Sequence, residues 1–430
     1  MNWPTTRLRY VADLNPGIRA DLLQAPDVEV SFLPMDAIGE DGTLDLSRNR
    51  AVADVRNGYS YFEEGDVAFA KVTPCFENGK GALMRGLELG AGFGTTEITV
   101  LRPKEGTEPR FLNYVLRSAQ FRQNGVGAMT GAGGLKRVPD EFTRDFKTPW
   151  PTPAEQERIA NFLDEKTARI DALIAEKQAL LDSLKKHQYS YASELMTKGQ
   201  DSTAQLAETS HPELGAIPAH WAVKRLKFLG EVRSGIAKGK DHGERDTVLM
   251  PYLRVANVQD GYVDLTTVLE IEVGIHEVER YLLCRGDVLM NEGGDNDKLG
   301  RGTVWEGQIA PCVHQNHVFA VRLFDPSLAE WVARFTSTDS ARNYFFLRSK
   351  QSTNLASINQ SNVRELPVPM PPKEEREAIL AELQRASAAN EELTTHVVEH
   401  LSRLREYRSS LISAAVTGQL DLSTFKKAVQ

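Results

Sequence analysis

The chain has 430 residues, which is more than one hydrophobic core usually organises, so we expect at least two domains. With 41% hydrophobic and 26% charged residues, its composition is typical of a folded protein and excludes global disorder. The first twenty residues lack an apolar signal core and no stretch approaches the roughly 18 unbroken apolar residues of a membrane span, which predicts a cytoplasmic protein. Cys75, Cys284 and Cys312 stand singly, which excludes a disulfide framework and a C-x-x-C site.

The net charge of −8 argues against nucleic acid as a partner, because phosphate binding depends on Lys and Arg. The local balance is different. Residues 71–137 hold ten basic and five acidic side chains, and residues 333–364 hold five basic side chains and one acidic one. These two basic islands allow a local anion-binding face, although a solvated surface would give the same counts.

Residues 1–151 are predicted to form a first mixed domain. Short β-branched and aromatic runs such as 98–101 are separated by Gly-Asp, Asp-Gly and Pro-rich turns. This pattern indicates a globular domain with a substantial sheet.

A long helix is predicted over residues 152–198. Thr152 can cap it, Pro153 suits the first helical position, and Glu155 completes a capping box. Gly199 stands where a left-handed cap would end the helix. Apolar residues spaced by three and four predict a coiled-coil seam of Ile159, Leu163, Ile170, Leu173, Leu180 and Leu184, with Lys166 and Lys177 as its polar members.

The second half repeats the first at an offset of about 220 residues. Gly65-Asp66-Val67 recurs as Gly286-Asp287-Val288, and Gly79-Lys80-Gly81 recurs as Gly300-Arg301-Gly302. We therefore expect a linker over 199–219, a second domain over 220–371, a second long helix over 372–417 and a C-terminal tail over 418–430. The second seam is predicted at Ile379, Leu383, Leu393, Val397 and Leu404, with Ala386, Asn390 and His400 between them.

The fold class expected from these elements is α+β: two mixed α/β domains in tandem duplication, joined by two long helices with coiled-coil seams. Pairing these helices antiparallel would place the two domains in a pseudo-twofold relation. About 40 helical residues give a rod of roughly 60 Å. Two similar but unequal domains held at a fixed spacing suit a ligand with two separated sub-sites, and duplex DNA is the commonest ligand of that kind.

Several of these segments carry a family resemblance. The helix start Pro371-Pro372-Lys373-Glu374-Glu375-Arg376, its weaker twin at 151–156, the closing segment 414–421, the paired Gly-Asp-Val turns and the tract 291–302 resemble the DNA-specificity subunit of type I restriction-modification systems. The resemblance spans nearly the whole chain. It implies two target-recognition domains, each reading one half of a bipartite double-stranded DNA site. It also implies that the two long helices form an antiparallel coiled coil, which sets the spacing and docks two methyltransferase (modification) subunits, in a complex with restriction/translocase subunits.

The same resemblance implies a non-catalytic chain without a cofactor of its own. S-adenosylmethionine, ATP and Mg²⁺ are then expected on the partner subunits. Base edges in the major groove are read by Arg and Lys on guanine and by Asn and Gln on adenine, so candidate contacts lie in the basic islands and beside flexible glycines. The candidate DNA-binding residues are Lys71, Thr73, Asn78, Lys80, Lys136 and Arg137 in the first domain, and Asn291, Lys298, Arg301, Lys350, Ser352, Asn354 and Asn359 in the second.

Catalytic patterns are present only in fragments. His396-Val397-Val398-Glu399-His400 matches a zinc pattern, but Val397 and His400 fall on the predicted seam and no third ligand is indicated. Asp140, Asp145 and Lys147 faintly resemble a nuclease cluster, but the acidic residues are too close together in sequence to come from two converging strands. The glycines from 125 to 134 lack the Lys-Ser/Thr of a phosphate-binding loop. His314 and His317 are expected on a strand.

Two other classes of function remain open from the sequence. A protein-binding scaffold with two docking domains and no role in DNA binding would explain the duplication and the acidity. A stand-alone nuclease or methyltransferase would need a catalytic constellation that the sequence does not display.

Overall fold

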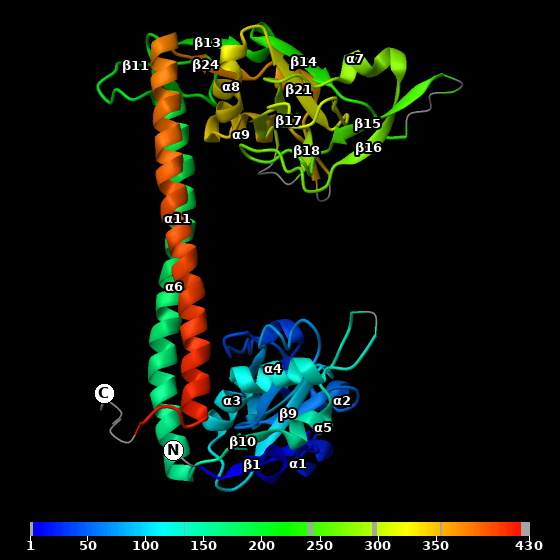
Figure 1. The fold of residues 1–430 in the computed structure, drawn as a ribbon, viewed down its shortest axis with the longest axis vertical. Coiled ribbons are helices and arrows are strands. Elements are labelled where there is room, and N and C mark those ends of the chain that lie inside the picture. Colours follow the sequence, from blue (N-terminus) through cyan, green and yellow to red (C-terminus); the bar gives the residue numbers. More distant parts are fainter. Residues whose placement is uncertain are drawn as a thin grey trace. The chain divides into compact units, whose positions relative to one another are not determined.

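The computed structural model of the chain describes residues 3–132, 134–239, 243, 245–294, 299–352 and 355–422. It divides into two compact units, Met1–Gln178 with Val397–Gln430, and Ala179–His396. The long helices α6 (Pro153–Lys198) and α11 (Lys373–Val416) contribute a segment to each unit (Figure 1). Both begin and end within a residue of the predicted bounds.

In its described residues, the first unit contains two four-stranded sheets, the five short α-helices α1 to α5 and a segment of each long helix. The sheet orders are β2-β9-β6-β7 and β4-β3-β8-β5, with β1 paired to β10. Neighbouring strands are antiparallel except β3 and β8. The elements are β1 (Thr5–Arg7), β2 (Ala12–Leu14), α1 (Ala20–Gln24), β3 (Glu29–Leu33), β4 (Asn49–Ala51), α2 (Val52–Val55), β5 (Ser60–Glu63), β6 (Val67–Ala70), β7 (Gly81–Leu83), β8 (Ala91–Gly94), β9 (Ile98–Pro103), α3 (Pro109–Arg117), α4 (Ala119–Ala128), α5 (Asp140–Asp145) and β10 (Lys147–Pro149).

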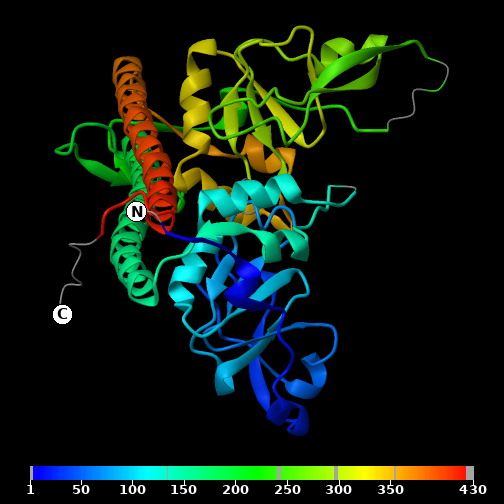
Figure 2. The ribbon, with the colours of Figure 1, turned by 60° about the horizontal axis from the view of Figure 1, so that its bottom comes forward.

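The second unit repeats this plan. Its main sheets are β14-β21-β17-β19 and β16-β15-β20, and α8 lies alongside the helix pair in both views (Figures 1 and 2). The elements are β11 (Leu206–Glu208), β12 (Ala216–Pro218), β13 (Ala222–Arg225), β14 (Gly230–Ser234), β15 (Thr247–Leu253), β16 (Leu269–Gly274), α7 (Val278–Tyr281), β17 (Val288–Asn291), β18 (Gly293–Gly294), β19 (Gly302–Val304), β20 (Val313–His314), β21 (Val318–Leu323), α8 (Ala329–Thr336), α9 (Asp339–Arg348), β22 (Lys350–Ser352), β23 (Leu355–Ser357), α10 (Gln360–Arg364) and β24 (Pro367–Met370). The tract 199–219, which we expected to be a linker, contains the hairpin of β11 and β12.

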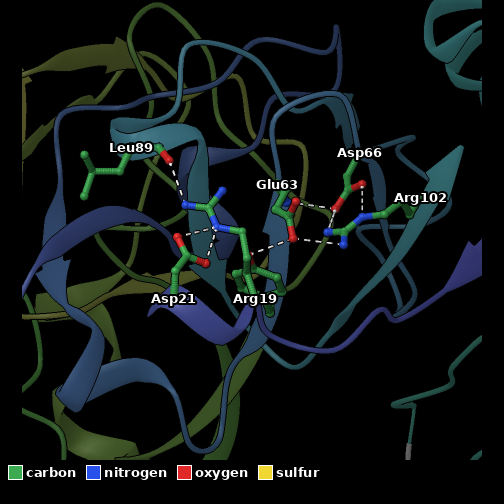
Figure 3. Close-up of polar contacts among 7 residues, drawn as sticks. Arg19, Asp21, Glu63, Asp66, Leu89 and Arg102 are labelled. Carbon is green, nitrogen blue, oxygen red and sulfur yellow. Dashed lines mark hydrogen bonds and ion pairs between the residues drawn. The ribbon is translucent and has the colours of Figure 1, made fainter. Parts of the chain in front are cut away.

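The repeated Gly-Asp-Val turn has a structural explanation in both units. Asp66 is 2% exposed, accepts the amide N–H of Glu63 at 2.8 Å, and receives two hydrogen bonds from Arg102 at 2.8 and 2.9 Å (Figure 3). Asp287 is 1% exposed and is bound by Arg322 in the same bidentate way, at 2.8 Å for each bond. A carboxylate at this position therefore ties the turn to the neighbouring strand, which is why the motif recurs.

In each unit the two long helices run antiparallel. The beginning of α6 packs on the end of α11 in the first unit, where Ile159, Leu163 and Ile412 share one core with Phe121. The end of α6 packs on the beginning of α11 in the second unit, where Leu195, Ile379 and Leu383 share another. The predicted antiparallel pairing is therefore present in both units.

Every other position of the predicted seam is wrong by one residue. Leu173, Leu180 and Leu393 are 44%, 37% and 44% exposed, whereas Leu181 and Leu401 are 8% and 3% exposed. Leu163 and Ile170 of α6 are buried as predicted, and Leu184 is half-buried. Thr167 and Leu181 are buried and Ile174 is half-buried, in place of the predicted positions 166, 180 and 173. Adjacent apolar pairs, such as 173–174 and 180–181, fit both phases equally well, so apolar periodicity could not choose between them.

The corresponding series in α11 follows the same phase. Ile379, Leu383 and Val397 are buried and Leu404 is half-buried. Asn390 is a polar seam residue as predicted, and its amide donates to Gln188 Oε1 at 2.7 Å. The equivalent pair in the first unit is Ile170 with Arg408, whose guanidinium reaches Asp171 at 2.7 Å. The two seams therefore share a phase and differ in their polar partners.

Candidate nucleic-acid interface

The first domain brings four of its predicted residues onto neighbouring segments. The chain that leaves β6 runs beside a hairpin formed by residues 130–137. The amide of Thr73 donates to the Lys136 carbonyl at 2.9 Å, and the amide of Val138 donates to the Lys71 carbonyl at 2.8 Å. Thr130 and Arg137 exchange backbone hydrogen bonds at 3.0 and 2.8 Å and close the hairpin. These backbone pairings bring Lys71, Thr73, Lys136 and Arg137 together on two neighbouring segments of this unit, with Arg137 opposite Val72.

The side chains of these residues differ in how strongly other residues of the unit already hold them. Lys136 is exposed and forms no ion pair within the described residues. Arg137 is bound to Glu97 at 2.9 Å, and this hydrogen bond lowers the pKa of the Glu97 carboxyl. Lys71 lines an open hollow of about 270 Å³ together with Tyr59 and Tyr61. An anionic ligand would meet Lys136 directly, whereas Arg137 would first have to leave Glu97.

Asn78 and Lys80 lie in the turn between β6 and β7. Asn78 is exposed. The Lys80 ammonium donates to the carbonyl of Met35 at 2.9 Å, so it holds a neighbouring loop. Lys80 is therefore already engaged in an internal contact.

An equivalent hairpin exists in the second domain. β22 pairs with β23, and β23 pairs with β18, which follows β17 as the Lys71 tract follows β6. The amide of Ile358 donates to the Glu292 carbonyl at 2.8 Å, matching the bond of Val138 in the first unit. Lys350 is exposed at the start of this hairpin and Ser352 lies at the end of β22. Lys298 and Asn354 lie outside the described residues.

Three predicted residues of the second domain make internal contacts. Asn291 is 2% exposed, and its amide donates to the Val258 carbonyl at 3.0 Å, so its side chain is not on the surface. Arg301 reaches Gln259 Oε1 at 3.5 Å, toward the same loop. Asn359 is exposed and caps α10 by accepting the amide N–H of Asn362 at 2.9 Å. Arg301 and its equivalent in the repeat, Lys80, therefore both contact a neighbouring loop.

Ion pairs explain why counting charges along the sequence overstated the free positive charge of the two basic islands. Arg102 binds Asp66, Arg110 binds Asp164 at 2.9 Å, and Arg342 binds Asp260 at 3.0 Å. These partners lie outside the islands in sequence, so counting along the chain could not find them. The cations left exposed without an ion pair in the described structure include Lys136 and Lys350.

The catalytic fragments do not come together. Asp145 is bound by Arg7 at 3.2 Å, and Asp140 accepts from the amide of Asn15 at 3.2 Å. His396 and His400 are exposed on α11. No three His, Cys, Asp or Glu side chains within the described residues are arranged to hold a metal ion.

None of the described helices is both long and apolar enough to cross a membrane.

Known proteins similar to this chain belong to one group. The specificity subunits of the type I restriction enzymes EcoAI and EcoEI of Escherichia coli are 38% identical over 189 residues and 36% identical over 212 residues. These matches cover 43% and 48% of this chain, but only 31% and 34% of those two proteins, about a third of their length. The EcoKI specificity subunit of Escherichia coli K12 is 24% identical over 327 residues, covering 75% of this chain and 68% of that protein.

Solved structures extend the likeness to the whole fold. A chain from a type I restriction-modification system, solved to explain complex assembly and conformational transition, matches with a TM-score of 0.72, 18% identity and coverage of 97% of this chain and 98% of that one. The HsdS subunit of Thermoanaerobacter tengcongensis matches with a TM-score of 0.51, 18% identity and 97% coverage of both chains. No protein-family model matches the chain. The homologues of this chain are type I restriction enzyme specificity subunits, and the chain has the fold of an S subunit.

Proposed function

We propose that this chain recognises a bipartite DNA sequence for a type I restriction-modification complex, with one half of the site read by each domain. The observation that carries the proposal is the pair of equivalent hairpins, 130–137 and 350–357, each next to the strand that follows the Gly-Asp-Val turn. Each hairpin presents an exposed lysine, Lys136 or Lys350. Two equivalent but differently sequenced surfaces are what two different half-sites require.

The test is a binding selection from random duplexes, using the chain together with its methyltransferase partner. We expect two short specified sequences separated by a spacer of fixed length. Lys136→Ala should weaken binding and lower the salt slope by about one unit if the lysine contacts a phosphate. Glu208→Ala, which changes an exposed side chain on β11, is the control and should leave both unchanged. Selection of no sequence would support the alternative of a protein-docking scaffold without a DNA role.

Leu173 and Leu393 supply a candidate surface for two methyltransferase subunits. They lie 220 residues apart, and each is 44% exposed on the outer face of its helix. Leu393 also borders an open hollow of about 370 Å³ lined by Tyr191, Ala386 and Ala389. Two equivalent apolar positions fit two copies of one partner.

Aspartate substitutions test this docking surface. Leu173→Asp should remove one methyltransferase copy, Leu393→Asp the other, and the double variant both. Leu23→Asp, at a similarly exposed leucine of α1, away from the two long helices in sequence, is the control. Retention of two copies by the double variant, measured by light scattering, would exclude this surface.

We further propose that the chain has no catalytic activity of its own, and that S-adenosylmethionine, ATP and Mg²⁺ act on the modification and restriction/translocase subunits. The purified chain should neither methylate nor cut DNA with these ligands until a methyltransferase is added. Either activity from the chain alone would contradict the proposal.

A further inference from the structure

Asp260 is the meeting point of three elements in the second unit. It lies in the loop between β15 and β16, and its carboxylate accepts from Arg342 Nη2 of α9 at 3.0 Å and from the Tyr189 hydroxyl of α6 at 3.4 Å. The Ser337 hydroxyl also donates to it. The Arg342 guanidinium stacks over the Tyr189 ring, with its central carbon 4.8 Å from the ring centroid. One carboxylate therefore bonds the domain to its supporting helix.

Partial burial strengthens the ion pair between Asp260 and Arg342. The side chains of Asp260 and Arg342 are 18% and 29% exposed, so solvent screens the pair less than it would a surface salt bridge. The planar guanidinium can bind a carboxylate through its N–H edge while its flat face stacks on an aromatic ring, and a lysine ammonium has no such planar face. These contacts give the loop a defined place on α6.

The same loop touches the tract where DNA contacts are proposed. The Val258 carbonyl accepts from Asn291, and Gln259 accepts from Arg301, on either side of residues 292–300. A series of direct contacts therefore runs from Tyr189 on the long helix, through the Asp260 loop, to the segment that leaves β17.

Among the described residues of the first unit, this arrangement is absent. Asp41 occupies the equivalent Asp-Gly position, and its carboxylate accepts from the amide and hydroxyl of Thr43 at 3.0 and 2.7 Å, within its own loop. Arg117 of α3 holds that loop only through backbone carbonyls, with 2.6 Å to the Asp41 oxygen. The residue equivalent to Tyr189 is Ser409, which cannot reach as far or stack on a guanidinium.

We propose that Asp260 is a positioning residue, which fixes the orientation of the second domain on α6 and thereby sharpens the preference for one spacer length between the two half-sites. The inference rests on the proposed function. It assigns to Asp260, Arg342 and Tyr189 the geometry of recognition and no contact with bases.

The test compares spacer preference in the complex with its methyltransferase partner. Asp260→Asn should lower the ratio of binding at the preferred spacer to binding at spacers one base pair longer or shorter by about tenfold, the size expected for losing one charge-assisted hydrogen bond. Arg342→Lys, which keeps the charge but loses the stacking, should lower it by less. Both half-site sequences should stay the same, because no base contact changes.

Asp41→Asn is the matched control, because its carboxylate bonds only within its own loop, and its spacer preference should match that of the wild-type chain. If the wild-type complex selects no bipartite site, the proposed function fails. If it selects one and Asp260→Asn is as selective for spacer length as the wild-type chain, the positioning role alone is overturned. If Asp260→Asn is too unstable to purify, Tyr189→Phe, which removes only one hydroxyl, should still broaden the spacer preference, and an unchanged preference in that variant would also overturn the role.

Discussion

Ser193 and Ser413 lie 220 residues apart and make the same contact in the two units. The Ser413 hydroxyl on α11 accepts the amide N–H of Ala119, the first residue of α4, at 2.9 Å. The Ser193 hydroxyl on α6 accepts the amide N–H of Asp339, the first residue of α9, at 3.1 Å. Each domain is therefore docked on the long helix of the other repeat.

This exchange predicts matched effects on stability. Ser413→Ala and Ser193→Ala should each lower the free energy of unfolding by about 1 kcal/mol, because a helix N-terminal amide loses its acceptor. Ser410→Ala, at an exposed position of α11, controls for the higher helix propensity of alanine. Urea titration of the three variants measures the effect, and equal midpoints for all three would show that the contacts do not hold the domains.

The buried carboxylates of the repeated turns should matter more. Asp66→Asn removes the buried carboxylate that Arg102 binds through two hydrogen bonds, while Glu63 stays 2.9 Å from the guanidinium. Because Arg102 keeps this second carboxylate, we expect a loss of about 1.5 to 3 kcal/mol, the range for a hydrogen bond to a charged group. Asp287→Asn should do the same through Arg322. Asp54→Asn changes an exposed carboxylate and should leave the thermal unfolding midpoint nearly unchanged. A midpoint shift no larger than that of Asp54→Asn would contradict the assigned role of the turn.

His314 should make the second unit sensitive to acid. Burial lowers the pKa of its imidazole to about 4, below the value near 6.5 of an unfolded chain. Its Nδ1 lies 2.6 Å from the Val318 carbonyl, while Nε2 has no hydrogen-bond partner among the described residues. The unfolded chain therefore binds a proton that the folded chain does not, so stability is present above pH 6.5 and falls as the pH decreases toward 4.

Between pH 7.5 and pH 5 this single group should cost about 2 kcal/mol of unfolding free energy. His314→Asn keeps a donor for Val318 and does not titrate, so the variant should lose about that much less over the same range. Tryptophan fluorescence in urea follows the unfolding. Identical pH dependence in both proteins would show that His314 does not titrate as described.

The sequence predicted the duplication and the bounds of both long helices, because glycines, caps and apolar periodicity are local signals. The antiparallel pairing came from the family resemblance, since local signals do not give the orientation of two helices. It could not choose the phase of the seam, since Leu173 and Leu180 stand beside Ile174 and Leu181. It also could not show that Lys80 and Arg301 face neighbouring loops, or that Arg137 pairs with Glu97 across 40 residues. The assignment of individual DNA contacts stays a prediction, because tertiary partners decide which cations are free.

The corrected seam defines how the helices can be lengthened. Buried positions repeat every seven residues, so inserting one heptad after Lys177 and one after the equivalent Val397 preserves the seam phase in both helices. Seven residues add about 10.5 Å, or about three base-pair steps of 3.4 Å, so the preferred spacer should lengthen by about three base pairs. A four-residue insertion after Lys177 alone breaks the phase and is expected to lower stability. An unchanged spacer in a stable double-heptad variant would refute the idea that the helices set it.

The most direct test of the account is an exchange of residues 1–151 for the first domain of another S subunit, followed by selection of bound DNA in the presence of the methyltransferase partner. We expect that one half of the selected sequence changes to that of the donor protein, while the other half and the spacer length stay the same. A change in both halves, or in neither, would contradict the claim that each domain recognises one half-site independently while the long helices hold both domains.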